Sequence, residues 1–238
     1  MPEGFERLWE GGALFRQGEG AFKLSTDSVL LAHFVGKKQV KSFIDLGCGA
    51  GVLTLLLKSA MPKAYCAGID IQPESAELCR ENLRVNGYED SGILTGDLRE
   101  HRSLYRAESF GLVVSNPPYF AAGSGFTAPA ESRAIARDER FCTLSDLCAA
   151  AKYLCRYGGY FCLVHRPERL SEIFVELTKN GLEPKRLRMV QHHEGSAPNL
   201  VLIEARRGAK PELSIEPPLI MTAPGGGDSA EIKEIYHR

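Results

Sequence analysis

The feature that most constrains this chain is a regular alternation of apolar runs and helical segments that begins at residue 42. Four short apolar runs are bounded by glycine, proline or acidic residues, as buried strands are. They span residues 42–47, 64–69, 92–95 and 110–114. Helical segments at 50–59 and 74–86 separate the first three runs, and parallel strands need such crossovers. The pattern therefore predicts an α/β fold with a mainly parallel sheet.

The same signals continue in the second half of the chain. They predict a helix, a strand, a second helix and two further strands, at 143–157, 160–165, 167–181, 186–191 and 199–205. We expect the last two strands to pair antiparallel, with His192 and His193 as turn residues rather than a catalytic base. Gly158-Gly159 predicts a turn, and a short helix is expected at the C-terminus. The long connection 120–142 lacks a clear period, and such loops are usually functional.

Composition restricts the class of protein. With 238 residues, 44% of them apolar and 25% charged, the chain can form one α/β domain with a sizeable core. No apolar run approaches the roughly 20 residues that span a bilayer, and MPEGFERLWEGG lacks the apolar region of a signal peptide. We therefore expect a cytoplasmic protein without a membrane segment. A net charge of −1 argues against indiscriminate coating of nucleic acid but allows a local basic face.

Seven cysteines raise the question of a metal or disulfide framework. Their spacing contains no C-x-x-C and no short Cys/His pair of the kind that binds zinc. We expect free thiols that pack as small apolar side chains, and no metal.

Acidic residues follow three successive predicted strands. Asp45 stands at the end of the first, Asp70 at the end of the second and Asp97 after the third. In an open parallel sheet, ligands bind at the carboxyl ends of strands, beside the point where strand order reverses. Each aspartate could instead cap the following helix. Three of them beside a glycine turn favour a binding site.

The first strand leads into the glycine turn Asp45-Leu46-Gly47-Cys48-Gly49-Ala50-Gly51. Glycines here allow the backbone to approach a ligand closely and to lead into a helix N-terminus. The turn departs from the dinucleotide pattern G-x-G-x-x-G because Val52 occupies the third glycine position. A nicotinamide-dependent oxidoreductase is therefore the weaker interpretation.

The fourth predicted strand runs into Asn116-Pro117-Pro118-Tyr119. The two prolines lack N–H donors and fix their own φ, so the strand must end in a stiff turn. An exocyclic amine is a poor nucleophile because its lone pair is delocalised, and two acceptors on its N–H groups would draw the nitrogen toward tetrahedral geometry. The side-chain oxygen of Asn116 and the carbonyl of Pro117 are such acceptors. Tyr119 offers a flat face on which a base can stack. The alternative is a turn that only terminates the strand.

The glycine turn, the three aspartates and the Asn-Pro-Pro-Tyr sequence together resemble class I S-adenosylmethionine-dependent methyltransferases. The resemblance implies a Rossmann-like, seven-stranded α/β fold, mainly parallel with an antiparallel last strand pair, and S-adenosylmethionine as cofactor. In that family the acid and glycines of DLGCGAG face the methionine moiety, while the residues matching Asp70 and Asp97 bind the ribose and the adenine. An acidic pocket also suits the cationic groups of this cofactor. The implied cofactor-binding residues are Thr26, Asp45, Gly47, Cys48, Gly49, Gly51, Asp70, Ile71, Asp97, Leu98 and Asn116.

Asn-Pro-Pro-Tyr further resembles the signature of amino methyltransferases that act on adenine N6, on guanine N2 or on the glutamine amide of release factors. The implied catalytic residues are Asn116, Pro117, Pro118 and Tyr119. Segments 21–32, 137–147, 163–170 and 199–208 resemble the bacterial tRNA adenine-N6 methyltransferases, which modify adenine 37 of a valine tRNA. This resemblance runs from about residue 12 to 236 and implies tRNA as the partner.

A nucleic acid requires stacking and phosphate contacts. The implied substrate-binding residues are Tyr119, Phe120, Arg133, Arg137 and Arg140, and further phosphate contacts are expected from Lys185, Arg186 and Arg188. The competing interpretation for each cation is solvated surface charge. Relatives that modify release factors usually carry an N-terminal helical domain, and only about 40 residues precede Asp45, which favours nucleic acid.

Several alternatives stay open at this point. They are guanine-N2 methylation of RNA, adenine-N6 methylation of DNA, glutamine-N5 methylation of protein and, in a different class, a non-catalytic S-adenosylmethionine- or RNA-binding module. Such a module would have no need of the Asn116 acceptor. The predicted organisation is an N-terminal extension completing the pocket (1–40), a methyltransferase domain (41–208) and a C-terminal extension (209–238). The oligomeric state is left open.

Overall fold

The computed structural model describes residues 2–17, 26–117 and 142–237. Within these ranges the strands of the main sheet are β3 (Ser42–Leu46), β4 (Tyr65–Asp70), β5 (Ser91–Thr95), β6 (Phe110–Ser115), β7 (Cys155–His165), β8 (Leu182–Gln191), β9 (Pro198–Arg207) and β10 (Ser214–Ile220). A separate hairpin pairs β1 (Glu6–Arg7) with β2 (Leu14–Phe15). The helices are α1 (Thr26–Val35), α2 (Val52–Ala60), α3 (Pro73–Val85), α4 (His101–Leu104), α6 (Leu144–Leu154), α7 (Leu170–Lys179) and α8 (Ala230–Ile235), with 3-10 turns η1 (Leu98–Glu100) and η2 (Pro167–Arg169).

The strand order of the main sheet is β10-β8-β9-β7-β6-β3-β4-β5. Neighbouring strands are parallel except at β9, which runs antiparallel to both β7 and β8. This order confirms the predicted Rossmann-like methyltransferase fold, with β8 and β9 as the antiparallel last pair.

Strand β10 is an eighth strand that the sequence pattern does not predict. It comes from the predicted C-terminal extension and pairs parallel with β8 at the edge of the sheet. Pro217 and Pro218 lie where the pairing register shifts, between Glu216 and Leu219. An edge strand with such an irregularity tolerates residues that cannot donate a hydrogen bond.

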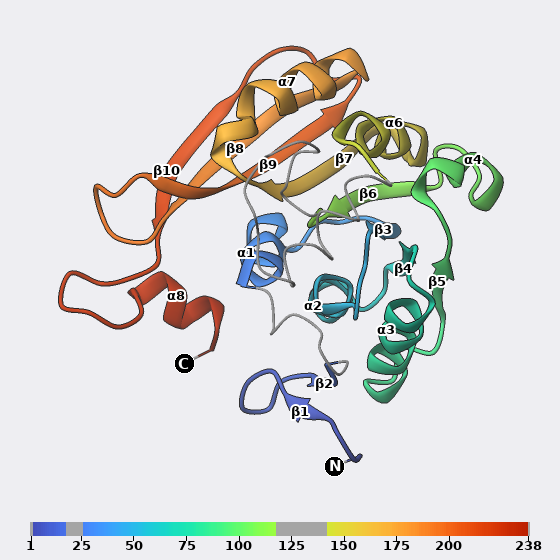
Figure 1. Ribbon diagram of the computed structural model, residues 1–238, viewed down its shortest axis with the longest axis horizontal. Coiled ribbons are helices and arrows are strands. Elements are labelled where there is room, and N and C mark those ends of the chain that lie inside the picture. The colour runs from blue at the N-terminus through green and yellow to red at the C-terminus, as the bar shows by residue number, and fades with distance from the viewer. Residues whose placement is uncertain (1, 18–25, 118–141, 238) are drawn as a thin grey trace, which may run out of the picture.

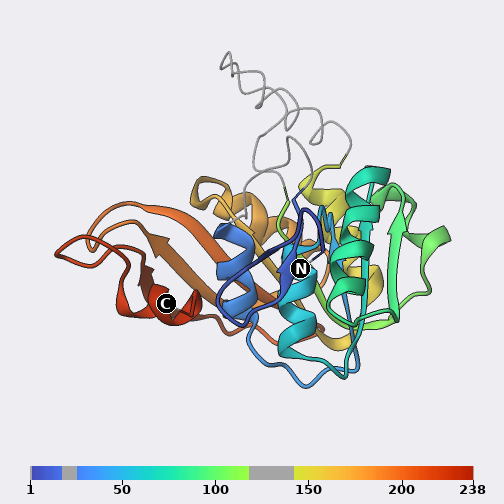
Figure 2. The same cartoon turned by 90° about the horizontal axis from the view of Figure 1, so that it is seen from below.

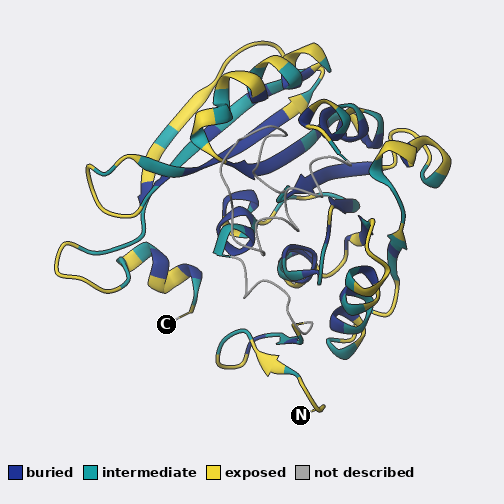
Figure 3. Ribbon diagram, in the orientation of Figure 1, coloured by how far each residue is buried: buried dark blue, intermediate teal, exposed yellow. Residues whose placement is uncertain are grey.

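Helices cover both faces of the sheet (Figure 1). α1, α2 and α3 lie on one face, and α6 and α7 lie on the other. Successive residues of the central strands alternate between two cores: Phe43 belongs to the core on the α1 and α2 face, and Ile44 to the core on the α6 face. β6 is buried along its whole length, and Figure 3 shows the same for the centre of the sheet. This burial explains why residues 110–114 form a continuous apolar run rather than an alternating one.

Charged side chains fasten the C-terminal segment to the sheet. Arg186 of β8 contacts Glu216 of β10 at 3.1 Å and Glu204 of β9 at 2.9 Å. Arg188 donates to both carboxylate oxygens of Glu231 in α8, at 2.5 and 2.8 Å. Both guanidinium groups are engaged within the protein, which favours a structural role over the phosphate contacts expected of these two arginines. Their role is to attach the tail.

The turn expected at Gly158-Gly159 is a bulge inside a strand, with φ of 72° at Gly158, rather than a connection between a helix and a strand. Both glycines lie inside β7, which begins at Cys155 directly after α6. The register between β6 and β7 shifts between Phe110 and Leu112, so this part of the strand is irregular. A Cβ on Gly159 would lie 2.7 Å from the Cys155 Sγ, which explains why this position requires glycine.

Two further expectations concern the whole chain. All seven cysteines are free thiols, and six of them are buried, as expected for side chains that pack like small apolar groups. No helix in the described ranges is long and apolar enough to cross a bilayer.

Two asparagines attach the N-terminal hairpin to α3, beside which it lies in Figure 2. The Asn86 side chain accepts from Leu14 N at 2.8 Å and donates to Leu14 O at 2.7 Å. Asn82, one helical turn earlier, accepts from Arg16 N at 2.8 Å and donates to Arg16 O at 3.0 Å. The two amides thus satisfy backbone groups of Leu14 and Arg16 as a second neighbouring strand would. Asn82 also donates to Ala50 O at 2.9 Å, which links the hairpin to the glycine turn.

We predict that Asn82→Ala lowers the free energy of unfolding by about 3 kcal/mol, because it leaves several buried backbone groups unpaired at about 1–3 kcal/mol each. Urea denaturation followed by circular dichroism measures this change. Arg84→Ala, at an exposed position of the same helix, is the matched control and should stay within about 0.5 kcal/mol of the wild type. Equal stability of the two variants would show that the hairpin contributes little to the fold.

Candidate active site

The strand order reverses between β3 and β6. From β3 the chain adds β4 and β5 on one side, then crosses over to add β6 and β7 on the other side. At such a switch point the loops after the two central strands diverge and leave a crevice at the carboxyl edge of the sheet. The glycine turn follows β3 and Asn116 follows β6. The topology therefore brings together the two motifs that the sequence analysis singled out.

The three glycines of the turn have different roles. All have positive φ: 77° at Gly47, 52° at Gly49 and 87° at Gly51. A Cβ on Gly47 or Gly49 would meet no atom of the described residues within 4 Å, so their backbone borders open space. A Cβ on Gly51 would lie 2.5 Å from the Cys79 Sγ, so Gly51 instead allows α2 and α3 to pack closely. The first two glycines leave room for a ligand, and the third serves the core.

Asp70 holds the glycine turn in place. Its Oδ2 accepts from Gly49 N at 2.8 Å and its Oδ1 accepts from Gln72 N at 2.9 Å. Partial burial raises the pKa of Asp70, and these two hydrogen bonds oppose the rise. Each carboxylate oxygen has a second lone pair, so Asp70 can still accept hydrogen bonds from a ligand's hydroxyl groups.

Asp45 is a buried carboxyl near the end of β3, just before the glycine turn, and is 1% exposed. Its Oδ2 accepts from Thr54 Oγ1 at 2.7 Å, whereas its Oδ1 has no hydrogen-bond partner among the described residues. Burial raises the pKa of Asp45 to about 7, with the Thr54 hydrogen bond opposing and nearby Asp70 adding to the rise. A buried acceptor without a partner is costly, and a cationic ligand in the crevice would satisfy it.

The remaining predicted cofactor residues differ in their surroundings. Asp97 caps η1 and pairs with Arg99, whose hydrogen bonds lower the pKa of Asp97. Asp97 therefore does cap the helical turn that follows it, which was the alternative interpretation of this residue. Ile71, directly after β4, is an apolar side chain with 42% exposure. Leu98 begins η1 and is partly exposed. The Cys48 side chain packs against Gly68, so Cys48 can offer a ligand only its backbone.

Asn116 is held by a residue from the other end of the chain. Its Nδ2 donates to Ser28 Oγ at 3.0 Å across 88 positions. Ser28 lies in the first turn of α1, two residues after Thr26. One residue before Asn116, Ser115 Oγ donates to Leu46 O at 2.7 Å and joins the ends of β6 and β3. The sequence analysis missed both serines, because Ser28 was only one residue of segment 21–32 and Ser115 lies between the apolar run 110–114 and Asn116.

Other predicted residues are not placed at this site. Pro118, Tyr119, Phe120, Arg133, Arg137 and Arg140 lie outside the described residues. Pro117 is described and partly exposed directly after Asn116. His192 and His193 lie in the turn after β8, as expected, with their ring centroids 4.4 Å apart.

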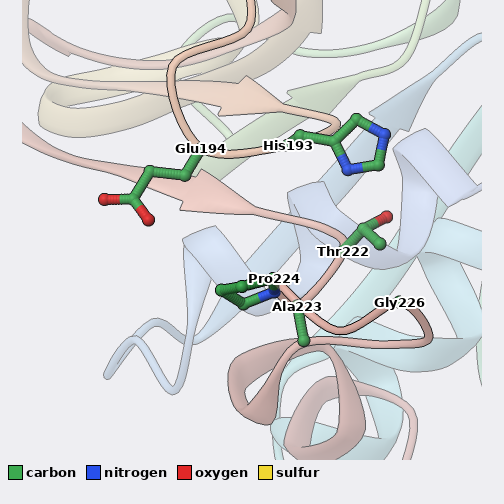
Figure 4. Close-up of a pocket in the computed structure, with 6 residues that line it drawn as sticks. All are labelled: His193, Glu194, Thr222, Ala223, Pro224 and Gly226. Atoms are coloured by element: carbon green, nitrogen blue, oxygen red, sulfur yellow. The ribbon is translucent and has the colours of Figure 1, made fainter.

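A shallow pocket opens beside that turn (Figure 4). It is lined by His193, Glu194, Thr222, Ala223, Pro224 and Gly226, and Figure 4 shows the Glu194 carboxylate pointing away from the His193 ring. β8 and β10 are parallel to β7, so the pocket shares the carboxyl edge with Asn116. β7, β9 and β8 separate it from β6 in the sheet order, and it contains none of the predicted site residues.

Comparison with known proteins identifies the family. Residues 21–164 match the family described as Methyltransferase small domain. The tRNA1(Val) (adenine(37)-N6)-methyltransferase of Porphyromonas gingivalis is 31% identical, over 78% of this chain and 75% of that protein. The protein of the same name from Aeromonas hydrophila is 30% identical, over 79% of this chain and 78% of that protein. The chain belongs to this methyltransferase family.

Solved structures agree with the fold. A protein described as a predicted O-methyltransferase, from Agrobacterium tumefaciens, has a TM-score of 0.72 with 21% identity, over 89% of this chain and 96% of that one. A geranyl diphosphate methyltransferase solved with sinefungin has a TM-score of 0.54 with 14% identity, over 76% of this chain and 77% of that one. At such identities these matches show the methyltransferase fold and no more.

The protein is an S-adenosylmethionine-dependent methyltransferase, and the crevice fits that cofactor. Gly47 and Gly49 leave room beside the backbone, and the Asp45 Oδ1, which has no hydrogen-bond partner among the described residues, suits the cationic methionine end. Asp70 can accept from hydroxyl groups, and Ile71 exposes apolar surface next to it. These residues therefore form an acidic, uncrowded site with apolar surface at one side, as a cationic nucleoside requires.

We predict that cofactor affinity of this methyltransferase depends on the charge of Asp45. Because the pKa of Asp45 is about 7 in the unliganded fold, the carboxyl is mostly protonated below that pH and must lose its proton when a cation binds. Affinity for S-adenosylmethionine should rise between about pH 5.5 and 7, by at most about tenfold per pH unit. Isothermal titration calorimetry measures it directly. Asp45→Asn should bind more weakly at pH 7 and lose most of this pH dependence.

The stability of the unliganded protein provides a control for the same variant. A carboxyl whose pKa is raised by folding binds its proton more tightly in the native state, so stability falls as pH rises from about 4 to 7. Asp45→Asn cannot titrate, and Thr54 can still donate to its amide oxygen. The variant should therefore gain stability relative to the wild type as pH rises. Parallel pH profiles for the two proteins, in binding and in unfolding, would contradict the assignment.

Proposed function

We propose that this methyltransferase transfers a methyl group to the N6 amino group of an adenine in tRNA. The observation that carries the proposal is the position of the Asn116 amide. It stands at the end of β6, across the switch point from the glycine turn, with its Nδ2 committed to Ser28. The names of the relatives from Porphyromonas gingivalis and Aeromonas hydrophila support adenine in tRNA as the substrate.

The chain's own groups would act on the amine in three ways. The Asn116 Oδ1 and the carbonyl of Pro117 accept the two N–H groups and turn the nitrogen lone pair toward the donor. Pro117 and Pro118 keep these acceptors in fixed positions, so little reorganisation is needed during reaction. Tyr119 stacks the adenine after it leaves its neighbours in the RNA.

S-adenosylmethionine supplies an electrophilic methyl group on a positively charged sulfur. The amine nitrogen forms the new N–C bond as the C–S bond breaks, and the bond electrons remain on sulfur. The methylated nitrogen then loses one proton to water, so a strong base is not required. In this proposal Asp45, Gly47, Gly49 and Asp70 hold the donor, with Thr26, Ile71, Asp97 and Leu98 around it.

The proposal also covers how the enzyme contacts the tRNA that carries the adenine. Arg133, Arg137 and Arg140, with Phe120, are the proposed contacts to the RNA. A tRNA substrate also fits the cytoplasm as the place of action. The 1–40 segment, which provides α1 and its contact to Asn116, would complete the pocket.

A single-turnover assay with methyl-labelled S-adenosylmethionine tests this function. Unmodified bulk tRNA, duplex DNA and a release factor are offered separately, and labelled RNA is digested to nucleosides. The expected product is N6-methyladenosine from tRNA. Label in N2-methylguanosine would change the assigned base, and label confined to DNA or protein would overturn the RNA substrate.

We predict that Asn116→Ala lowers turnover by about 100- to 1,000-fold, the usual effect of removing one pre-positioned hydrogen-bonding group. Its affinity for S-adenosylmethionine should remain within about twofold, because the amide acts on the acceptor amine rather than on the donor. Asn180→Ala, the same substitution at the C-terminal end of α7, is the matched control and should leave turnover unchanged. A fully active Asn116→Ala variant would end the proposed mechanism.

A further inference from the structure

Ser28 is a buried polar residue that the proposed mechanism does not yet use. It is 7% exposed, while four of its neighbours in α1, Val29, Leu30, Leu31 and Phe34, are core side chains. A buried hydroxyl normally has a hydrogen-bonding partner. The partner of the Ser28 Oγ is the Nδ2 of Asn116, at 3.0 Å.

In this contact the nitrogen end of the Asn116 amide faces α1, and the hydrogen bond restrains rotation of the amide plane. An amide is planar, and its oxygen and nitrogen point in different directions from the same carbon. With Nδ2 directed at Ser28, Oδ1 is directed elsewhere. If the amide turned by 180° about its last torsion, an N–H donor would take the place of the acceptor. Donor would then face donor at the substrate amine, and the polarisation required for transfer would be lost.

We propose that Ser28 is a positioning residue that restrains the Asn116 amide, so that the amide plane stays fixed beside the substrate amine. The inference rests on the proposed function and deepens it, because it assigns a role in the reaction to α1. Two supports fix the amide: Ser115 holds the strand end through Leu46 O at 2.7 Å, and Ser28 holds the amide plane. The first sets where Asn116 lies, and the second restrains rotation of its amide.

Kinetics of three variants test the proposal. Ser28→Ala removes the acceptor and should lower kcat by about tenfold, the equivalent of one hydrogen bond to a neutral partner. Affinity for S-adenosylmethionine should stay within about twofold. Ser28→Thr restores the hydroxyl and should recover most of kcat. Val29→Ala, the adjacent core position of α1, should lower thermal stability while leaving kcat of the folded enzyme unchanged.

A double variant separates positioning from a general loss of structure. If Ser28 acts only through Asn116, Ser28→Ala should cost nothing further in an Asn116→Ala background. An additional tenfold loss there would show that Ser28 acts on the site by another route. Equal kcat for Ser28→Ala and the wild type would overturn the proposal.

A spectroscopic measurement distinguishes failure of this inference from failure of the proposed function. In protein labelled with ¹⁵N-asparagine, the side-chain NH₂ signals that vanish in Asn116→Ala belong to Asn116. These signals should shift in Ser28→Ala and stay in place in Val29→Ala, whatever substrate the enzyme uses. Unmoved signals would refute the contact. Shifted signals together with an inactive wild type on tRNA would instead refute the substrate assignment.

Discussion

The site depends on one alignment, the meeting of the carboxyl ends of β3 and β6. Asp45 lies opposite Val114 in the parallel register, and the buried hydrogen bond from Ser115 Oγ to Leu46 O closes the pair where the regular ladder stops. The bond matters because the glycine turn follows β3 and Asn116 follows β6 directly after this point. This hydrogen bond fixes the position of the glycine turn relative to Asn116, the two features to which the proposed function assigns the chemistry.

The burial of Asp45 links the stability of the glycine turn to the cofactor that we propose binds there. The carboxyl has one internal partner, Thr54, and one oxygen without a partner among the described residues. A fold selected only for stability would avoid this arrangement, since an unpaired buried acceptor is unfavourable. It becomes favourable when a cation enters the crevice. The raised pKa of Asp45 is thus a property of the unliganded protein that a cation bound beside it would reverse.

Much of the fold and part of the site could be predicted from local sequence. Buried parallel strands give continuous apolar runs, so 42–47 and 110–114 were placed correctly, and the turn chemistry after them located the crevice. What could not be predicted depends on pairing between distant segments. β10 contains two prolines and is a strand only because β8 offers an edge. Gly158-Gly159 forms a bulge within β7 rather than an end of the strand, because β6 pairs with β7 on both sides of it.

The same limit applies to the side chains of the site. Asn116 was identifiable because the stiff turn around it gives it a chemical purpose, whereas Ser28 is an ordinary helical serine until the fold brings it to that amide. The hairpin shows the same principle, since Asn82 and Asn86 become a surrogate strand only where α3 meets β2. In both cases an amide is oriented by a partner more than 60 positions away in the sequence. The segment before β3 is therefore joined to the proposed active site: through Ser28 of α1 it contacts the amide to which the proposed mechanism assigns catalysis.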